Sequence, residues 1–113
     1  MRNGDVASTP ELQAHLDELV RRIVEAVHPI RILLFGSVAR GDVGPDSDVD
    51  VLVVMPDGSP KRETALFLHT RFQGLPFGVD VLIATPADLK EQRDNPGLIY
   101  GEILDEGKEL YAA

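Results

Sequence analysis

Two aspartates, two positions apart, lie where an apolar stretch begins. Asp48 and Asp50 flank Val49, and residues 51–55 are all apolar. Side chains at positions i and i+2 of a strand point to the same face of a sheet, so both carboxylates are expected on one face. Mg²⁺ is often bound by one or two carboxylates together with substrate phosphates. The alternative is that Asp48 ends a turn and Asp50 is a hydrogen-bonded polar residue at the strand start.

A third acid interrupts a second apolar stretch. Asp80 is the one charged residue in the segment 77–84. If the two stretches form neighbouring strands, Asp80 lies beside Asp50. Three acids around one cleft can hold two metal ions, which clamp the attacking and leaving oxygens of an in-line displacement. The alternative is that Asp80 bonds a helix N-terminus or a lysine.

A Gly-Ser pair precedes the aspartates. Gly36 and Ser37 follow the apolar segment 30–35, and ten residues separate Ser37 from Asp48. Glycine lets the backbone approach a phosphate closely, and a Gly-Ser turn can bring N–H groups and a hydroxyl to phosphate oxygens. A plain turn is the alternative.

An arginine follows the Gly-Ser pair after two residues. Arg40 can pair with a triphosphate or with a leaving pyrophosphate. It can equally form a surface ion pair with Asp42 or Asp46, which contributes little energy. Asp42 is expected to fix the loop. Together with the acids, these residues supply the parts of a metal-assisted phosphoryl or nucleotidyl transfer site.

Periodicity and turn residues predict the elements that position this site. Helical spacing, β-type apolar runs and capping signals divide the chain into alternating helices and strands. The expected helices are 10–28, 61–73, a helix starting at Pro86 with Thr85 as its cap, and 98–106; the expected strands are 30–35, 49–55, 77–84 and an edge strand at 109–111. The pattern predicts an α/β (α+β) fold, a small mixed sheet with helices packed mainly on one face.

Length and composition limit the function classes. The 113 residues suit one domain at 9–113, preceded by a disordered lead at 1–8. The 11 basic and 19 acidic residues give a net charge of −8, which argues against binding a long nucleic acid and suits a cation or a basic partner. No cysteine is present, which excludes disulfides and thiolate metal sites. No apolar run is long enough to span a membrane, and the N-terminus lacks the apolar core of a signal peptide. We therefore expect no membrane association and a cytoplasmic location.

The combined motif resembles the minimal nucleotidyltransferases of the polymerase-β superfamily. That family carries Gly-Ser, ten residues and then Asp-x-Asp, usually with Ala-Arg-Gly-Asp after the Gly-Ser. This chain has Gly36-Ser37, the segment 39–42 with the sequence Ala-Arg-Gly-Asp, and Asp48-Val49-Asp50 at the same spacing. The resemblance extends over most of the chain and implies a polymerase-β-like nucleotidyltransferase fold.

The resemblance also implies a role for each matching residue. Asp48 and Asp50 would bind Mg²⁺, expected as two ions, that bridges the nucleotide phosphates. Asp80 would be the third acid, which binds metal and helps to deprotonate or position the acceptor hydroxyl. Gly36 and Ser37 would hold the triphosphate of ATP, and Arg40 would assist. The acceptor oxygen would attack the α-phosphate and pyrophosphate would leave.

Minimal chains of this kind resemble antitoxins that are paired with a helical HEPN-domain ribonuclease toxin. In such pairs the nucleotidyltransferase can transfer AMP to a tyrosine of the toxin and silence it, and that function is our first hypothesis. Two alternatives stay open at this stage: an antitoxin that masks its partner by binding without chemistry, and nucleotidyl transfer to RNA or a small molecule with an acceptor domain supplied in trans. An exposed edge at the third strand or at the C-terminal segment allows a homo-oligomer.

Overall fold

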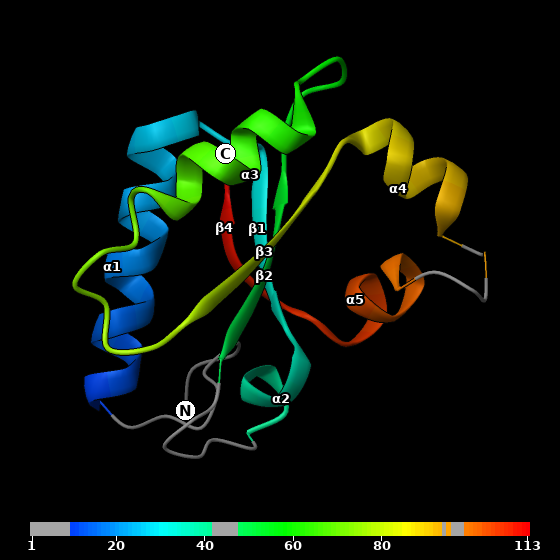
Figure 1. Ribbon diagram of the computed structural model, residues 1–113. Helices are drawn as coiled ribbons and strands as arrows, with labels where there is room; N and C mark the ends of the chain where they lie inside the picture. The colour runs from blue at the N-terminus through cyan, green and yellow to red at the C-terminus, as the bar shows by residue number, and fades with distance from the viewer. Residues whose placement is uncertain (1–9, 42–47, 94, 96–98) are drawn as a thin grey trace.

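The computed structural model describes residues 10–41, 48–93, 95 and 99–113. The predicted lead at 1–8 and the loop residues Asp42 and Asp46 lie outside the described residues. The elements in chain order are α1 (Pro10–Val27), β1 (Arg31–Phe35), α2 (Gly36–Ala39), β2 (Val49–Val54), α3 (Lys61–His69), β3 (Val79–Ala84), α4 (Pro86–Gln92), α5 (Tyr100–Glu106) and β4 (Lys108–Ala112) (Figure 1).

Within the described residues, four strands form one mixed sheet in the order β3-β2-β1-β4. β1 pairs antiparallel with both β2 and β4, whereas β2 and β3 are parallel. The parallel pair needs a crossover connection, and α3 provides it. The predicted fold class and the predicted edge strand near the C-terminus are confirmed, and the condition set for Asp80, that the second and third strands are neighbours, is met.

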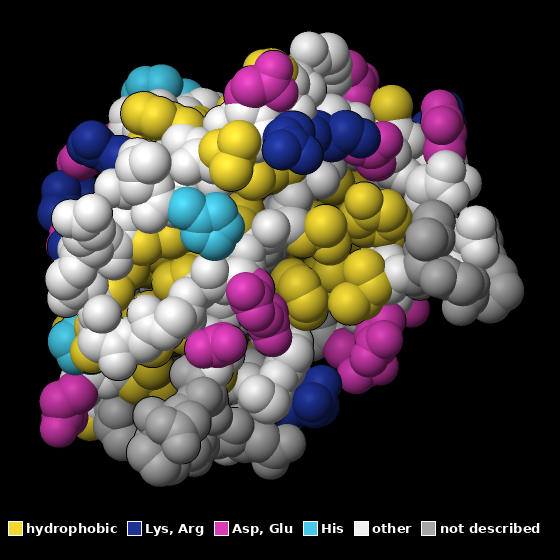
Figure 2. Space-filling model, viewed as in Figure 1, with side chains coloured by type: hydrophobic (Ala, Val, Ile, Leu, Met, Phe, Trp, Pro, Cys, Tyr) yellow, Lys and Arg dark blue, Asp and Glu magenta, His cyan; other side chains and the backbone are white. Residues whose placement is uncertain are grey.

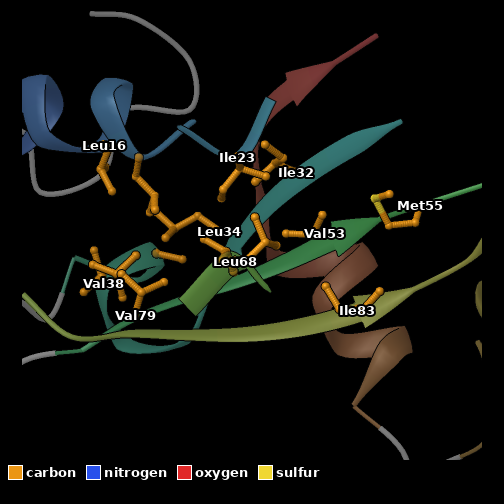
Figure 3. Close-up of a cluster of buried hydrophobic side chains, with 14 residues drawn as sticks. Leu16, Ile23, Ile32, Leu34, Val38, Val53, Met55, Leu68, Val79 and Ile83 are labelled. Atoms are coloured by element: carbon orange, nitrogen blue, oxygen red, sulfur yellow. The ribbon is translucent and has the colours of Figure 1, made fainter. Parts of the chain in front are cut away.

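The two faces of the sheet have separate hydrophobic clusters, because alternate strand residues point to opposite faces. The larger cluster lies under α1 and α3, the two longest helices, where Ile32 and Leu34 of β1 pack with Leu16, Ile23 and Leu68 (Figure 3). The smaller cluster lies under α4 and α5 and consists of Leu33, Leu52, Val54, Ala84, Leu89 and Ile103. Helices were expected mainly on one face; the longer ones lie there, and the short α4 and α5 cover part of the other face.

The helix boundaries follow local chemistry. At α4, the Thr85 hydroxyl accepts the N–H of Asp88 at 3.2 Å and the Asp88 carboxylate accepts the N–H of Thr85 at 3.0 Å, a capping box as predicted. Helix α3 ends at His69, four residues before the expected end, because the N–H groups of Thr70 and Arg71 bond carbonyls three residues back and close a tighter turn. No helix in the described ranges is long and apolar enough to span a bilayer.

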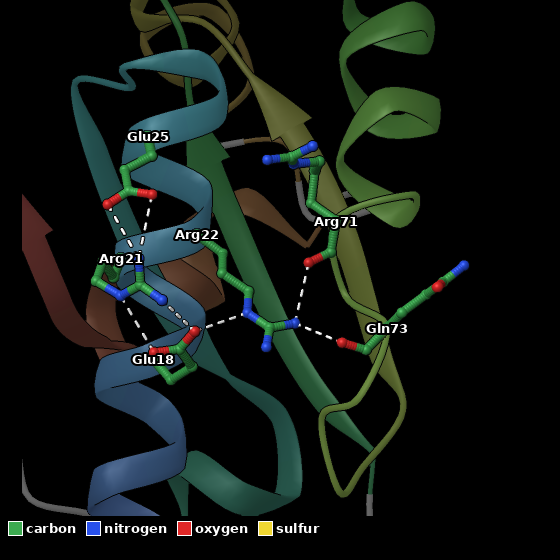
Figure 4. A network of polar contacts seen from close by, with 6 residues as sticks. All are labelled: Glu18, Arg21, Arg22, Glu25, Arg71 and Gln73. Atoms are coloured by element: carbon green, nitrogen blue, oxygen red, sulfur yellow. Dashed lines mark hydrogen bonds and ion pairs between the residues drawn. The ribbon is translucent and has the colours of Figure 1, made fainter.

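One arginine of α1 holds the segment that leads into β3. Arg22 Nη1 donates to the carbonyl oxygens of Arg71 at 3.2 Å and Gln73 at 2.6 Å, while its Nε donates to Glu18 at 2.8 Å (Figure 4). The neighbouring Arg21 pairs with Glu18 and Glu25 of its own helix instead. Arg22 therefore connects helix α1 with the chain that precedes the strand carrying Asp80.

Candidate active site

The sheet register brings two of the predicted acids opposite each other. Asp50 of β2 pairs in register with Asp80 of the parallel strand β3. By strand alternation, both share a face with Leu52 and Leu82, which belong to the cluster beneath α4 and α5. The site therefore lies on the face that only the short helices cover, near the end of the sheet where β2 and β3 begin.

Gly36 lies against the carboxylate of Asp50. The end of β1 pairs with the start of β2, with Phe35 opposite Asp50, and the chain then turns into α2. A Cβ atom at position 36 would collide with Asp50 Oδ2, and Gly36 has a φ of +78°, a conformation that side chains rarely adopt. Because glycine has no Cβ atom, this position leaves room for the Asp50 carboxylate. Ser37, the next residue, is half-buried in the first turn of α2.

A second glycine holds the space for Asp48. A Cβ atom at position 78 would lie 2.6 Å from Asp48 Oδ1. The backbone is fixed here as well, because the N–H of Val49 donates to the carbonyl of Gly78 at 2.9 Å. Gly78 was not among the predicted site residues. Its position two residues before Asp80, at the start of an acid-bearing strand, is the signal in the sequence that points to it.

The electrostatics of Asp50 reflect crowded negative charge. Burial raises the pKa of the Asp50 carboxyl; the charge of Asp80, hydrogen bonding with Asp80 and the charge of Asp48 raise this pKa further, and the Arg40 guanidinium lowers it. Figure 2 shows magenta carboxylates over the start of β2 and β3 and a dark-blue side chain beside α2. A cation placed among these carboxylates would relieve their mutual repulsion.

The donor set fits Mg²⁺ by its chemistry. The facing carboxylates of Asp50 and Asp80 offer oxygen ligands only, and Mg²⁺ sites commonly use one or two carboxylates plus substrate phosphates. Across the part of the chain that the structure describes, no group of three or more His, Cys, Asp and Glu side chains is arranged to hold a metal ion. The predicted three-acid, two-metal arrangement with Asp48 therefore stays a prediction.

A small pocket adjoins the site. It has a volume of about 50 Å³ and opens between α2 and α5, with Gly36, Arg40, Glu102 and Glu106 among its lining residues. The predictions from sequence did not include the two glutamates, since helical spacing alone places them on an ordinary solvated helix face. The structure thus gathers Gly36, Arg40 and the aspartates around one place and adds this pocket beside them.

Comparison with known proteins identifies the class. The nucleotidyltransferase domain family matches residues 16–110. The chain therefore belongs to the nucleotidyltransferase domain family, which makes it a transferase of nucleotidyl groups.

A solved structure has a similar fold. It is the crystal structure of a "putative nucleotidyltransferase" from Sulfolobus solfataricus, with a TM-score of 0.60, 19% identity, and coverage of 90% of this chain and 81% of that one. At this identity the similarity establishes the shared fold. No curated protein matches the chain by sequence.

Proposed function

We propose that this protein transfers AMP from ATP, with Mg²⁺, to the hydroxyl of a tyrosine on a partner HEPN-type toxin, and that it acts as the antitoxin of that partner. The observation that carries the transfer chemistry is the facing pair Asp50 and Asp80 beside Gly36, in a chain of the nucleotidyltransferase domain family. The antitoxin role and the tyrosine acceptor rest on the resemblance of the motif described above.

In the proposed reaction the protein positions reactants and compensates charge. Gly36 and Ser37 bind the triphosphate, and Arg40 pairs with the pyrophosphate end. Asp50 and Asp80, with Asp48 beside them, would hold Mg²⁺, which neutralises phosphate charge when it is bound. The acceptor oxygen forms a bond to the α-phosphorus as the bond to the bridging oxygen of pyrophosphate breaks. Asp80 orients the acceptor hydroxyl and takes its proton.

Two surface properties support a protein acceptor. The net charge of −8 favours association with a basic partner, such as a protein that binds RNA. The site face also carries apolar surface: Leu82, Tyr100 and Leu104 are only partly buried at the edge of the smaller cluster. Figure 2 shows hydrophobic surface in this region, between β3, α4 and α5. Such surface beside the carboxylates suits contact with a protein segment.

The proposal is tested with ATP labelled at the α-phosphate in a lysate of the source cell, with Mg²⁺. The variants are wild type, Asp50→Asn, and Asp17→Asn as a control that removes an exposed carboxylate from α1. We expect label in one small protein band with wild type and Asp17→Asn, and none with Asp50→Asn or with EDTA.

Other outcomes would replace the proposal. Label in RNA or in a small molecule would establish a different acceptor. A stable complex with a helical partner, formed equally by Asp50→Asn and without any labelled product, would instead establish an antitoxin that acts by binding alone.

A further inference from the structure

In the part of the chain that the structure describes, β3 is an edge strand with β2 as its neighbour (Figure 1). The N–H of Val49 donates to the carbonyl of Gly78 at 2.9 Å, and the N–H of Met55 donates to that of Ala84 at 2.8 Å. In a parallel ladder every second residue of a strand bonds the same neighbour, so the even-numbered residues of β3 bond β2. The backbone N–H and C=O groups of the odd-numbered residues point outward from the sheet. These residues are Val79, Val81 and Ile83.

The other edge strand, β4, has features that discourage a further strand, and β3 has few of them. The pairing of β4 with β1 shifts register between Ile32 and Leu33, and β4 carries the charged Lys108 and Glu109. Irregular pairing and charged side chains protect edges against strand addition. β3 pairs with β2 over six residues in continuous register, and its charged residue is Asp80 of the candidate site. The β3 edge is therefore the one suited to accept another strand.

A strand added to β3 would lie beside the candidate site. Asp80 points to the site face, and directly opposite residues of antiparallel strands have Cβ atoms about 4.5–5.5 Å apart. A side chain opposite Asp80 on the added strand would thus have its functional group within reach of the carboxylates. Leu82 lies on the same face, is partly buried, and offers apolar contact to a neighbouring side chain of that strand.

We propose that the acceptor hydroxyl reaches the site on an extended, basic segment of the partner protein, which adds as a strand to the edge of β3. The inference rests on the proposed function and names how its protein acceptor is bound. The segment pairs with the outward backbone groups of β3, and its tyrosine side chain lies opposite Asp80. The chemical step is unchanged: the phenol oxygen bonds to the α-phosphorus, pyrophosphate leaves, and Asp80 takes the proton.

Charge favours this occupant over a second copy of the chain. Asp48, Asp50 and Asp80 gather where β2 and β3 begin, and the net charge is −8. Two copies paired edge to edge would bring both sets of acids to one short edge, where like charges destabilise the pairing. Lysine or arginine side chains that flank the acceptor tyrosine would instead be attracted.

The experiment uses wild-type protein, α-phosphate-labelled ATP and Mg²⁺ with synthetic peptides at millimolar concentration. The parent peptide has a central tyrosine among valine and threonine residues and a lysine at each end. Two matched peptides carry backbone N-methyl groups, one on the tyrosine and the residues two positions away, the other on the residues between these. Each pattern blocks one edge of the extended peptide. A peptide turned to use its other edge directs its tyrosine away from the site face.

We expect label in the parent peptide and in one methylated peptide, with a rate lower by at least about 10-fold for the other, because it loses backbone hydrogen bonds to β3. The failing pattern also gives the direction of the added strand. Methyl groups beside the tyrosine block antiparallel addition, whereas a methyl group on the tyrosine itself blocks parallel addition.

A variant tests the same contact from the side of the enzyme. Val81→Pro removes an outward N–H that β2 does not use, and proline is tolerated at such edge positions. The matched control is Val81→Ala, which also alters this half-buried side chain but keeps the N–H. We expect Val81→Pro to label the parent peptide and the protein band of the lysate at least about 10-fold more slowly than Val81→Ala, with equal ATP affinity by isothermal titration calorimetry. The peptide comparison needs no variant, so it decides the question even where Val81→Pro does not fold.

Three results would overturn strand addition while the proposed function stands: equal labelling of both methylated peptides, equal failure of both, or a labelled protein band in the lysate with no peptide labelled. A wild-type dimer that dissociates in Val81→Pro, measured by sedimentation, would assign the edge to a second copy instead. Failure of the folded wild type to label any protein of the lysate would remove the proposed function, and strand addition with it.

Discussion

Replacement of Gly78 by alanine is expected to displace the Asp48 carboxylate without harming the fold. The added Cβ would lie 2.6 Å from Asp48 Oδ1, whereas ordinary van der Waals contact begins at 3.4 Å, so this oxygen has to move by about 0.8 Å. Gly78 does not have a positive φ, and alanine adopts its backbone conformation readily. A Gly-to-Ala change at such a position stabilises proteins by about 0.4–1 kcal/mol through the unfolded state.

The size of the functional loss follows from this displacement. A misplacement of about 1 Å in a reacting assembly can cost about 100-fold in rate. Because Asp48 is exposed and can partly adjust, we expect Gly78→Ala to lower the initial rate of label transfer by about 10-fold to 100-fold. The assay follows transfer from α-phosphate-labelled ATP to the acceptor, with thermal unfolding measured in parallel.

Gly58 provides a control with the opposite behaviour. It has a φ of +87°, and a Cβ there would have no atom within 4 Å. Gly58→Ala should therefore lose about 1–2 kcal/mol of stability through backbone strain and keep its transfer rate. In an Asp48→Ala background, Gly78→Ala should cost no further activity. The idea that Gly78 acts through Asp48 would be refuted if Gly78→Ala kept full activity. It would also be refuted if Gly78→Ala lowered activity by the same factor in the Asp48→Ala background as in the wild type.

Two further predictions concern stability. The pKa of Asp50 is raised in the folded state, so folding favours the protonated carboxyl. The contribution of Asp50 to the free energy of unfolding is therefore most favourable at low pH and is lost as pH rises through that pKa. Asp50→Asn should thus raise the Tm at neutral pH without Mg²⁺, with the gain vanishing below about pH 3.9, and a lower neutral Tm would contradict this. Arg22→Ala should lower the free energy of unfolding by about 1–2 kcal/mol, measured by urea denaturation, because two backbone carbonyls lose their hydrogen bonds to Arg22. Arg21→Ala, which removes pairing within α1 alone, should change it little. Equal losses for the two variants would show that pairing within the helix, and not the bonds to the carbonyls, stabilises the fold.

The elements of this fold are largely predictable, because each has a local signal. The apolar stripe of α1 and the Thr85 cap of α4 come from residues close in sequence, and both are found as predicted. The end of α3 was misplaced because helical spacing continues through Phe72, while the turn at Thr70 depends on hydrogen bonds that periodicity does not reveal. Helix ends are weakly encoded where no strong capping residue is present.

The acids of the candidate site could be predicted from the sequence more readily than the residues that surround them. Asp50 and Asp80 are conspicuous because each interrupts an apolar strand, and the parallel register then places them opposite each other. The position of Gly78 before Asp80 places it near the acids, but its role depends on a contact with Asp48, which lies far away in the chain. Such contacts follow from packing, and a single sequence carries no local pattern for them.

Because β3 lies at an edge of the sheet, the repulsion between Asp50 and Asp80 is expected to affect how readily β3 separates from β2. In the described part of the chain, the neighbour of β3 in the sheet is β2, and the repelling acids face each other across that pairing. Without a cation, amide protons of β3 should exchange with solvent sooner than those of the central strand β1. A cation and a nucleotide bound between the acids would slow this exchange, because ligands that bind the closed form stabilise it. Substrate would then help to hold this strand in the sheet.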